Sequence, residues 1–512
     1  MKRVLSILLV LLLAVTFVTG CSKNADESAD KTKTSAGDNT GRPSESKESA
    51  PDVKGKEGVT IKVFGPSNVE EFPEGEDENH NRIIEFLEEK SGYDIQWEIA
   101  PKENAREKIN LMMTSGVDCP DMIVSGDRNM GLDYIKEGVL RPIDEYLENT
   151  TNLKGMLDEA ANKMMMYEGN LYAVVVPQNQ EATTALVIRE DWLKNAGITK
   201  VPATLDEIRA AMEAFKANNP DCIPLTGSGS SDPLSGIQAF RGAFGVSTEY
   251  RVAGDVLEPT CITDDMKNLL TYMADLYKDG LLDPEYPTNK ADKVNEKLIS
   301  GKSGMVSAAW YDMKNRRDAL AEKDPNGKFI WTNPEGSDGR KGQNMNSPAR
   351  IYFFLPVHSE IPQDVINFLD IYVQEDVRKV VSYGWEGEHY KVENDLIVAT
   401  PKAEDIRYRI YYQLWDSKED FKNRVYLKGF GKDYDAMKPF STVEDPMWYA
   451  PLIPVKQDKA QTLSDLTNQY FIKFISNALP LDQFDKYVQE WKSSGGDEVV
   501  KAVNDWYTSS DK

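Results

Sequence analysis

The sequence predicts an α/β protein, because short β-branched runs alternate along the chain with segments of helical pattern. Residues 59–64 (VTIKVF) have the composition of a strand, and residues 93–99 (YDIQWEI) alternate polar and apolar side chains as a half-buried strand does. Residues 81–90, which lie between them, have a helical pattern. Strands that alternate with helices favour sheets whose strands are mainly parallel.

The same alternation continues downstream. A helix is expected at residues 103–115, followed by strands at 121–125, 171–176 and 184–188. Thr204, with Glu207 three residues later, forms a capping-box signature and predicts the start of another helix.

The C-terminal half contains further helical patterns. Apolar residues recur on one helical face between Met266 and Tyr277, and Gly280 predicts the end of that helix. Three more helices are expected in the tail, at residues 463–475, 481–491 and 497–507.

Composition argues against several classes of function. The chain has 512 residues with 60 basic and 84 acidic side chains, which gives a net charge of −24. A nucleic-acid-binding protein needs a basic surface to displace counterions from phosphates, so no nucleic-acid partner is expected. The three histidines lie far apart, and neither an HExxH motif nor paired CxxC motifs are present, so zinc chemistry has almost no ligands.

The N-terminus has the features of a secretory signal. Lys2 and Arg3 precede an apolar run at residues 4–18, which is too short for a typical membrane-spanning helix. The run ends in Val-Thr-Gly-Cys21, which resembles the lipobox of bacterial lipoproteins, in which the cysteine is acylated and becomes the first residue. An ordinary signal peptide with a chance cysteine is the alternative.

The segment that follows is expected to be a tether. Residues 21–57 contain no aromatic side chain and almost no large aliphatic one, so they cannot bury enough apolar area to offset the entropy cost of ordering. We therefore expect a signal peptide at residues 1–20 and a disordered tether at residues 21–57.

Three further cysteines, Cys119, Cys222 and Cys261, leave two possibilities open. An odd number in an extracellular protein allows at most one disulfide with one free thiol. Alternatively, all three serve as small buried hydrophobic residues. Their spacing does not decide between these alternatives.

Polar loops follow three of the predicted strands. In open α/β sheets, ligands bind at the carboxyl ends of strands. The loops after residues 59–64, 121–125 and 171–176 read GPSNVE, GDRNM and PQNQE, so they are candidate ligand-binding loops. Each could equally be an ordinary solvated loop.

Several longer segments together resemble a known family. They are residues 114–143, 168–197, 300–313, 348–373, 382–390 (SYGWEGEHY) and 485–505. In this order they resemble the bacterial extracellular solute-binding proteins of the oligosaccharide or maltodextrin class, and in particular a lipoprotein subgroup associated with importers of complex or acidic oligosaccharides. The resemblance covers residues 59–507.

The resemblance implies a two-lobe periplasmic-binding-protein-like fold of type II, with a hinge and a ligand cleft between the lobes. The N-lobe is expected at residues 58–180 and 326–373. The C-lobe is expected at residues 181–325 and 374–512, with a helical C-terminal extension.

The resemblance also implies a function. The protein is expected to be a monomer, lipid-anchored on the extracellular face of the cell membrane of a Gram-positive type of cell. It would capture an oligosaccharide by closing its lobes and deliver it to the permease subunits of an ABC transporter. No enzymatic activity and no cofactor are expected.

Aromatic side chains are candidate sugar contacts, because the C–H faces of sugars stack on aromatic rings. Trp310 and Tyr311 match the stacking position of the family, or else are core or hinge aromatics. Trp385 and His389 lie in the GWEGEHY turn and either contact the ligand or pack the loop.

Trp415 and Trp448 lie in the C-terminal third, where the family places further aromatic plates. Core packing is the alternative for both.

Polar candidates come from the loops. Asp127 and Arg128 match the first-lobe polar contacts of the family, or else form a pair that supports the loop. Glu181 is either a ligand-binding acid or a hinge salt-bridge partner, and this chain has one extra residue between it and the next strand. Asn68, in the first loop, is a weaker candidate.

No metal site is expected. The subgroup often carries a calcium-binding loop after the helix that Thr204 begins. Here residues 215–227 are too few and too poor in carboxylates to supply six or more oxygen ligands. Residues 322–329 lack the closing glutamate, so we interpret both segments as turns.

Three alternative functions remain open. A glycosidase would also use carboxylates and aromatic plates, but the acids form no distinct pair and no G-x-S-x-G motif is present. A binder of peptides or other small solutes, or a sensing or adhesive surface lipoprotein, could have the same fold. The sequence does not identify the glycan or show whether it is charged.

Overall fold

The computed structural model describes residues 58–65, 71–101, 104–181, 184–393 and 396–509. The chain divides into residues 1–51 and residues 52–512, and the described residues all belong to the second unit. The signal peptide, the acylated Cys21, the tether and Asn68 lie outside the described residues. Within the described ranges, no helix is both long enough and apolar enough to cross a membrane.

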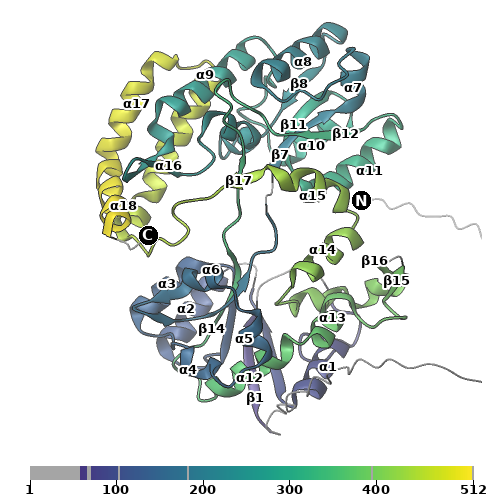
Figure 1. Cartoon of the computed structure of the whole chain (residues 1–512), viewed down its shortest axis with the longest axis vertical. Helices are drawn as coiled ribbons and strands as arrows, with labels where there is room; N and C mark the ends of the chain where they lie inside the picture. The colour runs from purple at the N-terminus through teal and green to yellow at the C-terminus, as the bar shows by residue number, and fades with distance from the viewer. Residues whose placement is uncertain (1–57, 66–70, 102–103, 182–183, 394–395, 510–512) are drawn as a thin grey trace, which may run out of the picture. The chain divides into compact units, whose positions relative to one another are not determined.

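The first lobe is built on a five-stranded sheet of order β2-β1-β3-β14-β6. Figure 1 labels β1 and β14 of this sheet. Its strands are β1 (Thr60–Gly65), β2 (Asp94–Ile99), β3 (Met122–Ser125), β6 (Val174–Pro177) and β14 (Ala349–Phe354). These positions confirm the strands predicted near residues 59–64, 93–99, 121–125 and 171–176.

The second lobe is built on a four-stranded sheet of order β12-β7-β11-β8. Its strands are β7 (Thr184–Arg189), β8 (Ile223–Thr226), β11 (Ser303–Ala309) and β12 (Phe329–Thr332). The two sheets confirm the two-lobe α/β architecture.

Each sheet contains one strand that runs against the others, and the remaining strands of each sheet run in one direction, so the prediction of mainly parallel sheets is confirmed with one exception in each. In the first sheet β14 runs antiparallel to β3 and β6, and in the second sheet β7 runs antiparallel to β11 and β12. Each of these two strands is the first that the chain forms after it passes from one sheet to the other. A strand that enters a lobe from the crossing point runs away from that point, whereas strands of ordinary β-α-β units run toward it.

Helices cover both sheets. Those whose buried side chains join the first core are α1 (Arg82–Ser91), α2 (Ala105–Ser115), α3 (Arg128–Glu137), α4 (Asp144–Leu147), α5 (Asn152–Met156), α6 (Glu159–Asn162), α12 (Pro362–Tyr372) and α13 (Glu375–Tyr383). Those that pack on the second sheet are α7 (Glu190–Asn195), α8 (Leu205–Asn218), α9 (Asp264–Lys278), α10 (Ala291–Ile299) and α11 (Met313–Lys323).

Shorter elements complete the two lobes. Two-stranded pairs are formed by β4 (Met166–Tyr167) with β5 (Asn170–Leu171), β9 (Tyr250–Ala253) with β10 (Val256–Pro259), β13 (Gln343–Asn344) with β17 (Ser441–Val443), and β15 (Tyr390–Glu393) with β16 (Leu396–Ala399). Longer 3-10 segments are η2 (Ser235–Phe244) and η5 (Pro401–Tyr411), and the helices α14 (Lys418–Leu427) and α15 (Gly431–Met437) follow η5.

Local sequence signals explain several helix ends. The Asn81 side chain accepts hydrogen bonds from the backbone of Ile83 and Ile84 and caps α1, and Gly92 ends that helix with a φ of 75°. The predicted capping box is present: Thr204 and Glu207 each accept a backbone hydrogen bond from the other at the start of α8. The apolar stripe between Met266 and Tyr277 is confirmed, because its members are largely buried in α9.

The predicted lobe boundaries need two corrections. Strand β12 hydrogen-bonds to β7 of the second sheet, although residues 326–373 were assigned to the N-lobe. Conversely, buried side chains between Val377 and Trp415 belong to the first core, although residues 374–512 were assigned to the C-lobe. The physical reason is that the apolar face of α13 packs against α1 and α12, which cover the first sheet.

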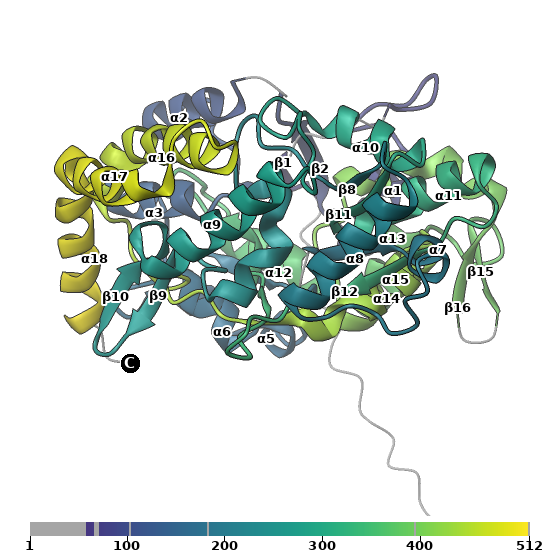
Figure 2. The ribbon, with the colours of Figure 1, turned by 90° about the horizontal axis from the view of Figure 1, so that it is seen from above.

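The C-terminal helices pack on the second lobe. They are α16 (Pro454–Ile475), α17 (Phe484–Trp491) and α18 (Asp497–Ser509), and Figure 2 shows α16 and α17 beside α9. Phe471, Phe474 and Tyr487 are fully buried in the second core. The three tail helices predicted from sequence are therefore confirmed, although α16 begins nine residues before the predicted start at residue 463.

The three remaining cysteines are free thiols. Cys222 is buried and the other two are partly buried, and burial raises the pKa of Cys119 to about 11. These thiols therefore serve as small packing residues, which was one of the two alternatives left open.

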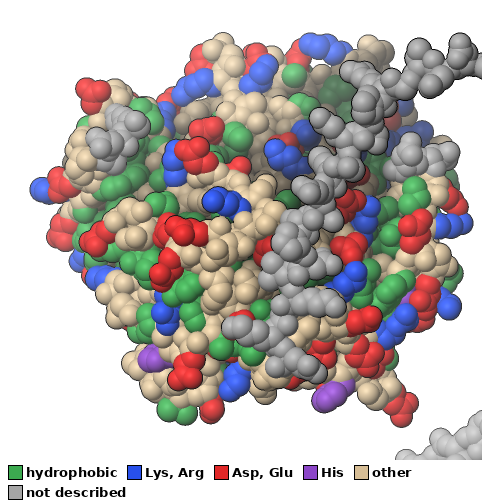
Figure 3. Space-filling view, turned by 60° about the horizontal axis from the view of Figure 1, so that its bottom comes forward, with side chains coloured by type: hydrophobic (Ala, Val, Ile, Leu, Met, Phe, Trp, Pro, Cys, Tyr) green, Lys and Arg blue, Asp and Glu red, His purple; other side chains and the backbone are tan. Residues whose placement is uncertain are grey.

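The surface is highly charged. On the face that Figure 3 presents, Lys and Arg side chains are interspersed with Asp and Glu side chains, and hydrophobic side chains lie between them.

The capping box gives a stability prediction. Thr204→Ala is expected to lower the free energy of unfolding by about 1 kcal/mol, because the α8 N-terminus loses a side-chain acceptor. Chemical denaturation would measure the change. Thr271→Ala, an exposed threonine within α9, is the matched control and should change stability little. Equal effects of the two substitutions would show that the cap does not contribute.

Candidate functional site

The chain passes between the two sheets through segments that are hydrogen-bonded to one another. Strand β13, which lies between β12 and β14, pairs in parallel with β17. The backbone N–H of Asn346 donates to the carbonyl of Glu181 (3.1 Å), and the Asn346 side chain donates to the carbonyl of Gln180 (3.0 Å). Ser441 Oγ also donates to the Glu181 carbonyl (2.6 Å). These bonds fix the backbone of the crossing region.

A cavity of about 710 Å³, here called the crossing cavity, lies at this region. It is lined by Ala160, Gln178, Asn179, Gln180, Glu181, Met345, Asn346, Ser347, Pro348, Lys418, Phe421, Lys422, Tyr426, Tyr434, Asp435, Lys438, Glu444, Trp448 and Tyr449. Its volume lies within the range of small-molecule binding pockets. Most lining side chains are amides, aromatic rings or charged groups, which together can hydrogen-bond and stack on a polar ring.

Glu181 is held by two side chains that line the same cavity. The Tyr434 hydroxyl donates to its carboxylate, and Lys438 forms an ion pair with it at 3.1 Å. Burial, and next the hydrogen bond to Glu181, raise the pKa of Tyr434, so this hydroxyl stays protonated and remains a donor. Glu181 therefore has an oriented carboxylate at the cavity wall.

Trp448 connects the crossing cavity with a second one. The adjoining cavity, of about 500 Å³, shares Glu444, Trp448 and Tyr449 with the crossing cavity. It also contains Arg251 and Arg340. Trp448 thus borders both cavities, and an indole ring offers a flat apolar face that is suited to stacking on a sugar.

Asp127 and Arg128 lie at the start of α3, and Arg128 holds backbone near Trp448. Asp127 caps the helix and forms an ion pair with Arg106. Arg128 donates to the carbonyls of Met164 and Ala450, each at 2.7 Å, and its burial lowers its pKa. Arg128 therefore positions the segment that carries Trp448.

Trp310 lies behind the cavity wall. Its side chain is only 6 % exposed, and its ring makes edge-to-face contacts with Phe421 and Tyr434, at centroid distances of 6.4 Å and 5.5 Å. Phe421 and Tyr434 line the crossing cavity, whereas Trp310 does not. Tyr311 is 47 % exposed and lies outside this lining.

Trp385 and His389 pack against each other in the first lobe. His389 accepts a hydrogen bond from the Trp385 backbone N–H (3.2 Å), and Arg82 lies over the Trp385 ring at 4.3 Å. Burial lowers the pKa of His389. The GWEGEHY turn that holds both residues has Gly384 and Gly387 at φ values of 82° and 81°.

Trp415 is fully buried in the first core, where its ring packs at 6.2 Å from Phe353. The structure therefore brings Glu181 and Trp448 together at the crossing cavity. The other described candidates lie elsewhere, and their direct contacts with a ligand stay predictions.

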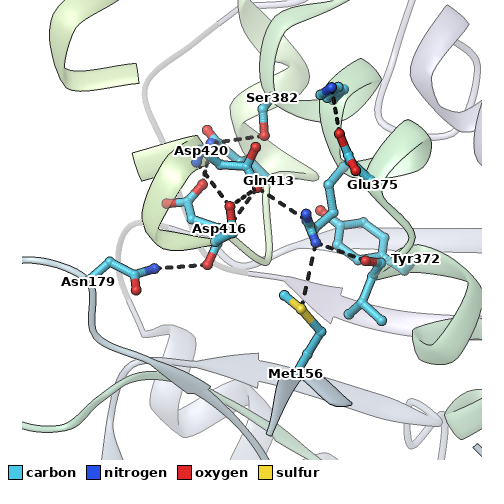
Figure 4. Close-up of polar contacts among 12 residues, drawn as sticks. Met156, Asn179, Tyr372, Glu375, Ser382, Gln413, Asp416 and Asp420 are labelled. Carbon is cyan, nitrogen blue, oxygen red and sulfur yellow. Dashed lines mark hydrogen bonds and ion pairs between the residues drawn. The ribbon is translucent and has the colours of Figure 1, made fainter. Parts of the chain in front are cut away.

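A buried carboxylate, Asp416, joins the crossing region to the first lobe. Its side chain is 1 % exposed and forms ion pairs with Arg350 (2.7 Å) and with Arg424. Gln413 donates to the same carboxylate at 2.8 Å, and Asn179 donates to the Asp416 backbone carbonyl at 2.8 Å (Figure 4). Asp416 thus links β14, α14 and the loop after β6.

Several lining residues were not predicted as site residues. The PQNQE loop was expected to be near the ligand, and Gln178, Asn179 and Gln180 do line the cavity. Asn346 and Ser347 just precede β14, and polar residues directly before a predicted return strand could have indicated them. Residues from α14 and α15 gave no sequence signal, because only the tertiary fold brings these helices to the crossing segments.

Within the described ranges, no group of three or more His, Cys, Asp or Glu side chains is arranged to hold a metal ion.

The chain matches a known family and known proteins. Residues 72–379 match the family described as bacterial extracellular solute-binding protein. Lipoprotein LipO of Bacillus subtilis (strain 168) is 24 % identical over 485 residues, which cover 88 % of this chain and 93 % of LipO. The polygalacturonan/rhamnogalacturonan-binding protein YtcQ of the same organism is 23 % identical, over 82 % of this chain and 87 % of YtcQ.

A solved structure has the same fold. The HMO-binding, ABC-transporter-associated solute-binding protein from Bifidobacterium longum infantis superposes with a TM-score of 0.70. The two are 16 % identical, and the match covers 89 % of this chain and 99 % of that protein.

The Asp416 cluster gives a second prediction. Asp416→Ala is expected to lower the free energy of unfolding by about 3–5 kcal/mol, because it leaves two arginines without their buried counter-charge. Chemical denaturation would measure the loss. Asp458→Ala, at an exposed position of α16, is the control and should change stability by less than about 0.5 kcal/mol. A loss at Asp416 no larger than the control's would contradict the proposed role of the cluster.

Proposed function

This chain belongs to the bacterial extracellular solute-binding proteins, and we propose that it captures an oligosaccharide in the crossing cavity for an ABC importer. The observation that carries the proposal is the crossing cavity itself. It combines aromatic rings, side-chain amides and an oriented carboxylate at the junction of two lobes.

The chemistry of the lining suits a sugar. Sugar hydroxyls act as donors and acceptors at once, so they pair well with the amides of Gln178 and Asn346 and with the carboxylate of Glu181. The apolar faces of a sugar ring stack on aromatic side chains, and Trp448 would supply such a side chain. We assign Glu181 and Trp448 as ligand contacts, Arg128 as the residue that positions Trp448, and Trp310 as the support behind Phe421 and Tyr434.

A relative supports a saccharide ligand. YtcQ is named as a polygalacturonan/rhamnogalacturonan-binding protein, and this chain aligns with most of its length. In the crossing cavity, Lys418 and Lys422 have no ion-pair partner among the described residues, so they could pair with the carboxylates of such a ligand. Acidic and neutral oligosaccharides both belong in the test.

Lobe closure would link binding to delivery. A ligand that contacts both lobes binds the closed state more tightly, so it shifts the population toward that state. The crossing segments would act as the hinge, since they are the connections along which the lobes can rotate. The closed form would then be the one that a permease recognises, and no bond of the sugar needs to be broken.

The N-terminal motif supports membrane anchoring. Acylation of Cys21 would place the folded lobes on the extracellular face of the membrane, with residues 22–57 as the tether. The tether would raise the effective concentration of this protein near its permease. As a monomer the protein would present one cleft to each permease.

The binding role of Trp448 can be tested directly. Trp448→Ala is expected to lower the affinity for the oligosaccharide by about tenfold or more, because buried aromatic anchors often contribute about 2 kcal/mol to binding. Isothermal titration calorimetry with a panel of acidic and neutral oligosaccharides and short peptides would measure it. Tyr167→Ala, at an exposed aromatic outside the cavity, is the control. Binding of peptides alone, or of no saccharide, would reject the proposed function.

Anchoring is tested by a separate variant. Cys21→Ala is expected to move the protein from the membrane fraction to the soluble secreted fraction, because the acylated thiol is lost. Fractionation followed by immunoblotting would show this. Ser22→Ala, at the next position, is the control and should leave the protein at the membrane. Membrane association of Cys21→Ala equal to that of the wild type would disprove the lipobox interpretation.

A further inference from the structure

A second polar cavity lies away from the crossing cavity and is strongly basic. This basic cavity has a volume of about 520 Å³. It is lined by Lys314, Asn315, Tyr383, His389, Tyr390, Ala399, Ala403, Glu404, Arg407, Arg409, Ile410, Gln413, Arg424, Leu427, Lys428 and Phe430. Five of these side chains are Lys or Arg and only one is a carboxylate, in a chain whose net charge is −24. The local charge therefore opposes that of the whole protein.

Arg424 carries positive charge that its own partner does not neutralise. Its partner Asp416 also forms an ion pair with Arg350, so two guanidinium groups share one carboxylate. The Arg424 side chain is 18 % exposed and lines the basic cavity, so its incompletely neutralised charge is accessible to an anion there.

Lys428 adds a second positive charge. It has no ion-pair partner among the described residues, whereas Lys314 pairs with Asp318 at 2.7 Å. The pKa of Lys428 is lowered, first because surrounding protein reduces its hydration and second because Arg424 repels its charge. An anion in the cavity would offset the repulsion between Arg424 and Lys428.

The basic cavity is distinct from the sugar site. Arg424 in α14 and Lys428, the residue that caps the end of this helix, are four residues apart and line the basic cavity. Lys418 and Lys422 lie on another face of α14 and line the crossing cavity. The rings of Tyr383, Tyr390 and Phe430 line the basic cavity. A ligand bound there would not compete directly with an oligosaccharide.

We propose that the basic cavity binds a small organic molecule that carries a dianionic oxyanion, such as a sugar-sized phosphate monoester. A dianion can neutralise the charges of Arg424 and Lys428 together. One guanidinium group can also donate two parallel hydrogen bonds to two oxygens of such an anion. The cavity volume is that of a small-molecule pocket rather than of a bare ion, and the aromatic rings offer surface to the organic part.

Calorimetric titration of the purified protein with glucose 6-phosphate, with glucose and with inorganic phosphate tests the proposal. Glucose 6-phosphate is expected to bind, glucose should not bind at this site, and inorganic phosphate should bind more weakly than the ester. Lys428→Glu is expected to lower the affinity for glucose 6-phosphate by at least about tenfold, because it places a like charge beside the dianion. Its affinity for the oligosaccharide should stay unchanged.

Lys432→Glu is the matched control, because it makes the same charge change at an exposed position of α15 outside the cavity. It should bind glucose 6-phosphate like the wild type. The proposal is overturned if the wild type does not bind the ester, if both variants weaken binding equally, or if inorganic phosphate binds as tightly as the ester. Because Lys428 follows the last residue of α14 and forms no ion pair among the described residues, its variant is expected to fold, and an unchanged thermal melting temperature would verify this.

Discussion

The buried carboxylate of Asp416 is the interaction on which the arrangement of the crossing region depends. A carboxylate removed from water is stable only if several donors replace its hydration, and here Arg350, Arg424 and Gln413 do so. These donors come from β14, from α14 and from the segment after η5, which are far apart in the sequence. The backbone of the same residue accepts from Asn179, so the loop that carries Glu181 is held to the same point.

This constraint explains why two polar cavities, the crossing cavity and the basic cavity, lie close together. The crossing cavity lies on one face of α14, and the basic cavity lies on another. Helix α14 orders the walls of both cavities. Ser417 and Asp420 form a reciprocal capping box at its N-terminus, and Asp420 also forms an ion pair with Arg378. A single short helix thereby contributes to a site proposed for a sugar and to a site proposed for an anion.

Much of the fold was predictable from local pattern. The strands near residues 59–64, 93–99 and 121–125 were recognised from β-branched composition and alternation, and the α8 start from Thr204 and Glu207. The direction of β7 and β14 was not predictable in this way. A strand's direction within its sheet depends on which lobe the chain has just left, and no local pattern records this.

The site was only partly predictable, for the same reason. Glu181 and the amides around it were indicated because a polar loop followed a predicted strand, and Trp448 was indicated by resemblance. Trp310 and Trp415 were assigned to the site by the same resemblance, yet their rings are buried behind Phe421 or within the first core. An aromatic residue in sequence is equally compatible with a core and with a ligand plate, and only its three-dimensional neighbours decide.

The sequence by itself determined the α/β class, the positions of most strands and helices, the excess of acidic charge and the lipobox-like motif at Cys21, because these depend on residue composition and spacing. Only the tertiary structure decided which segments belong to each lobe, which polar residues line the crossing cavity, and that Arg424 and Lys428 share a basic one. These features depend on contacts between residues such as Arg350 and Asp416, which are distant in the chain, and short-range sequence patterns carry no information about such contacts.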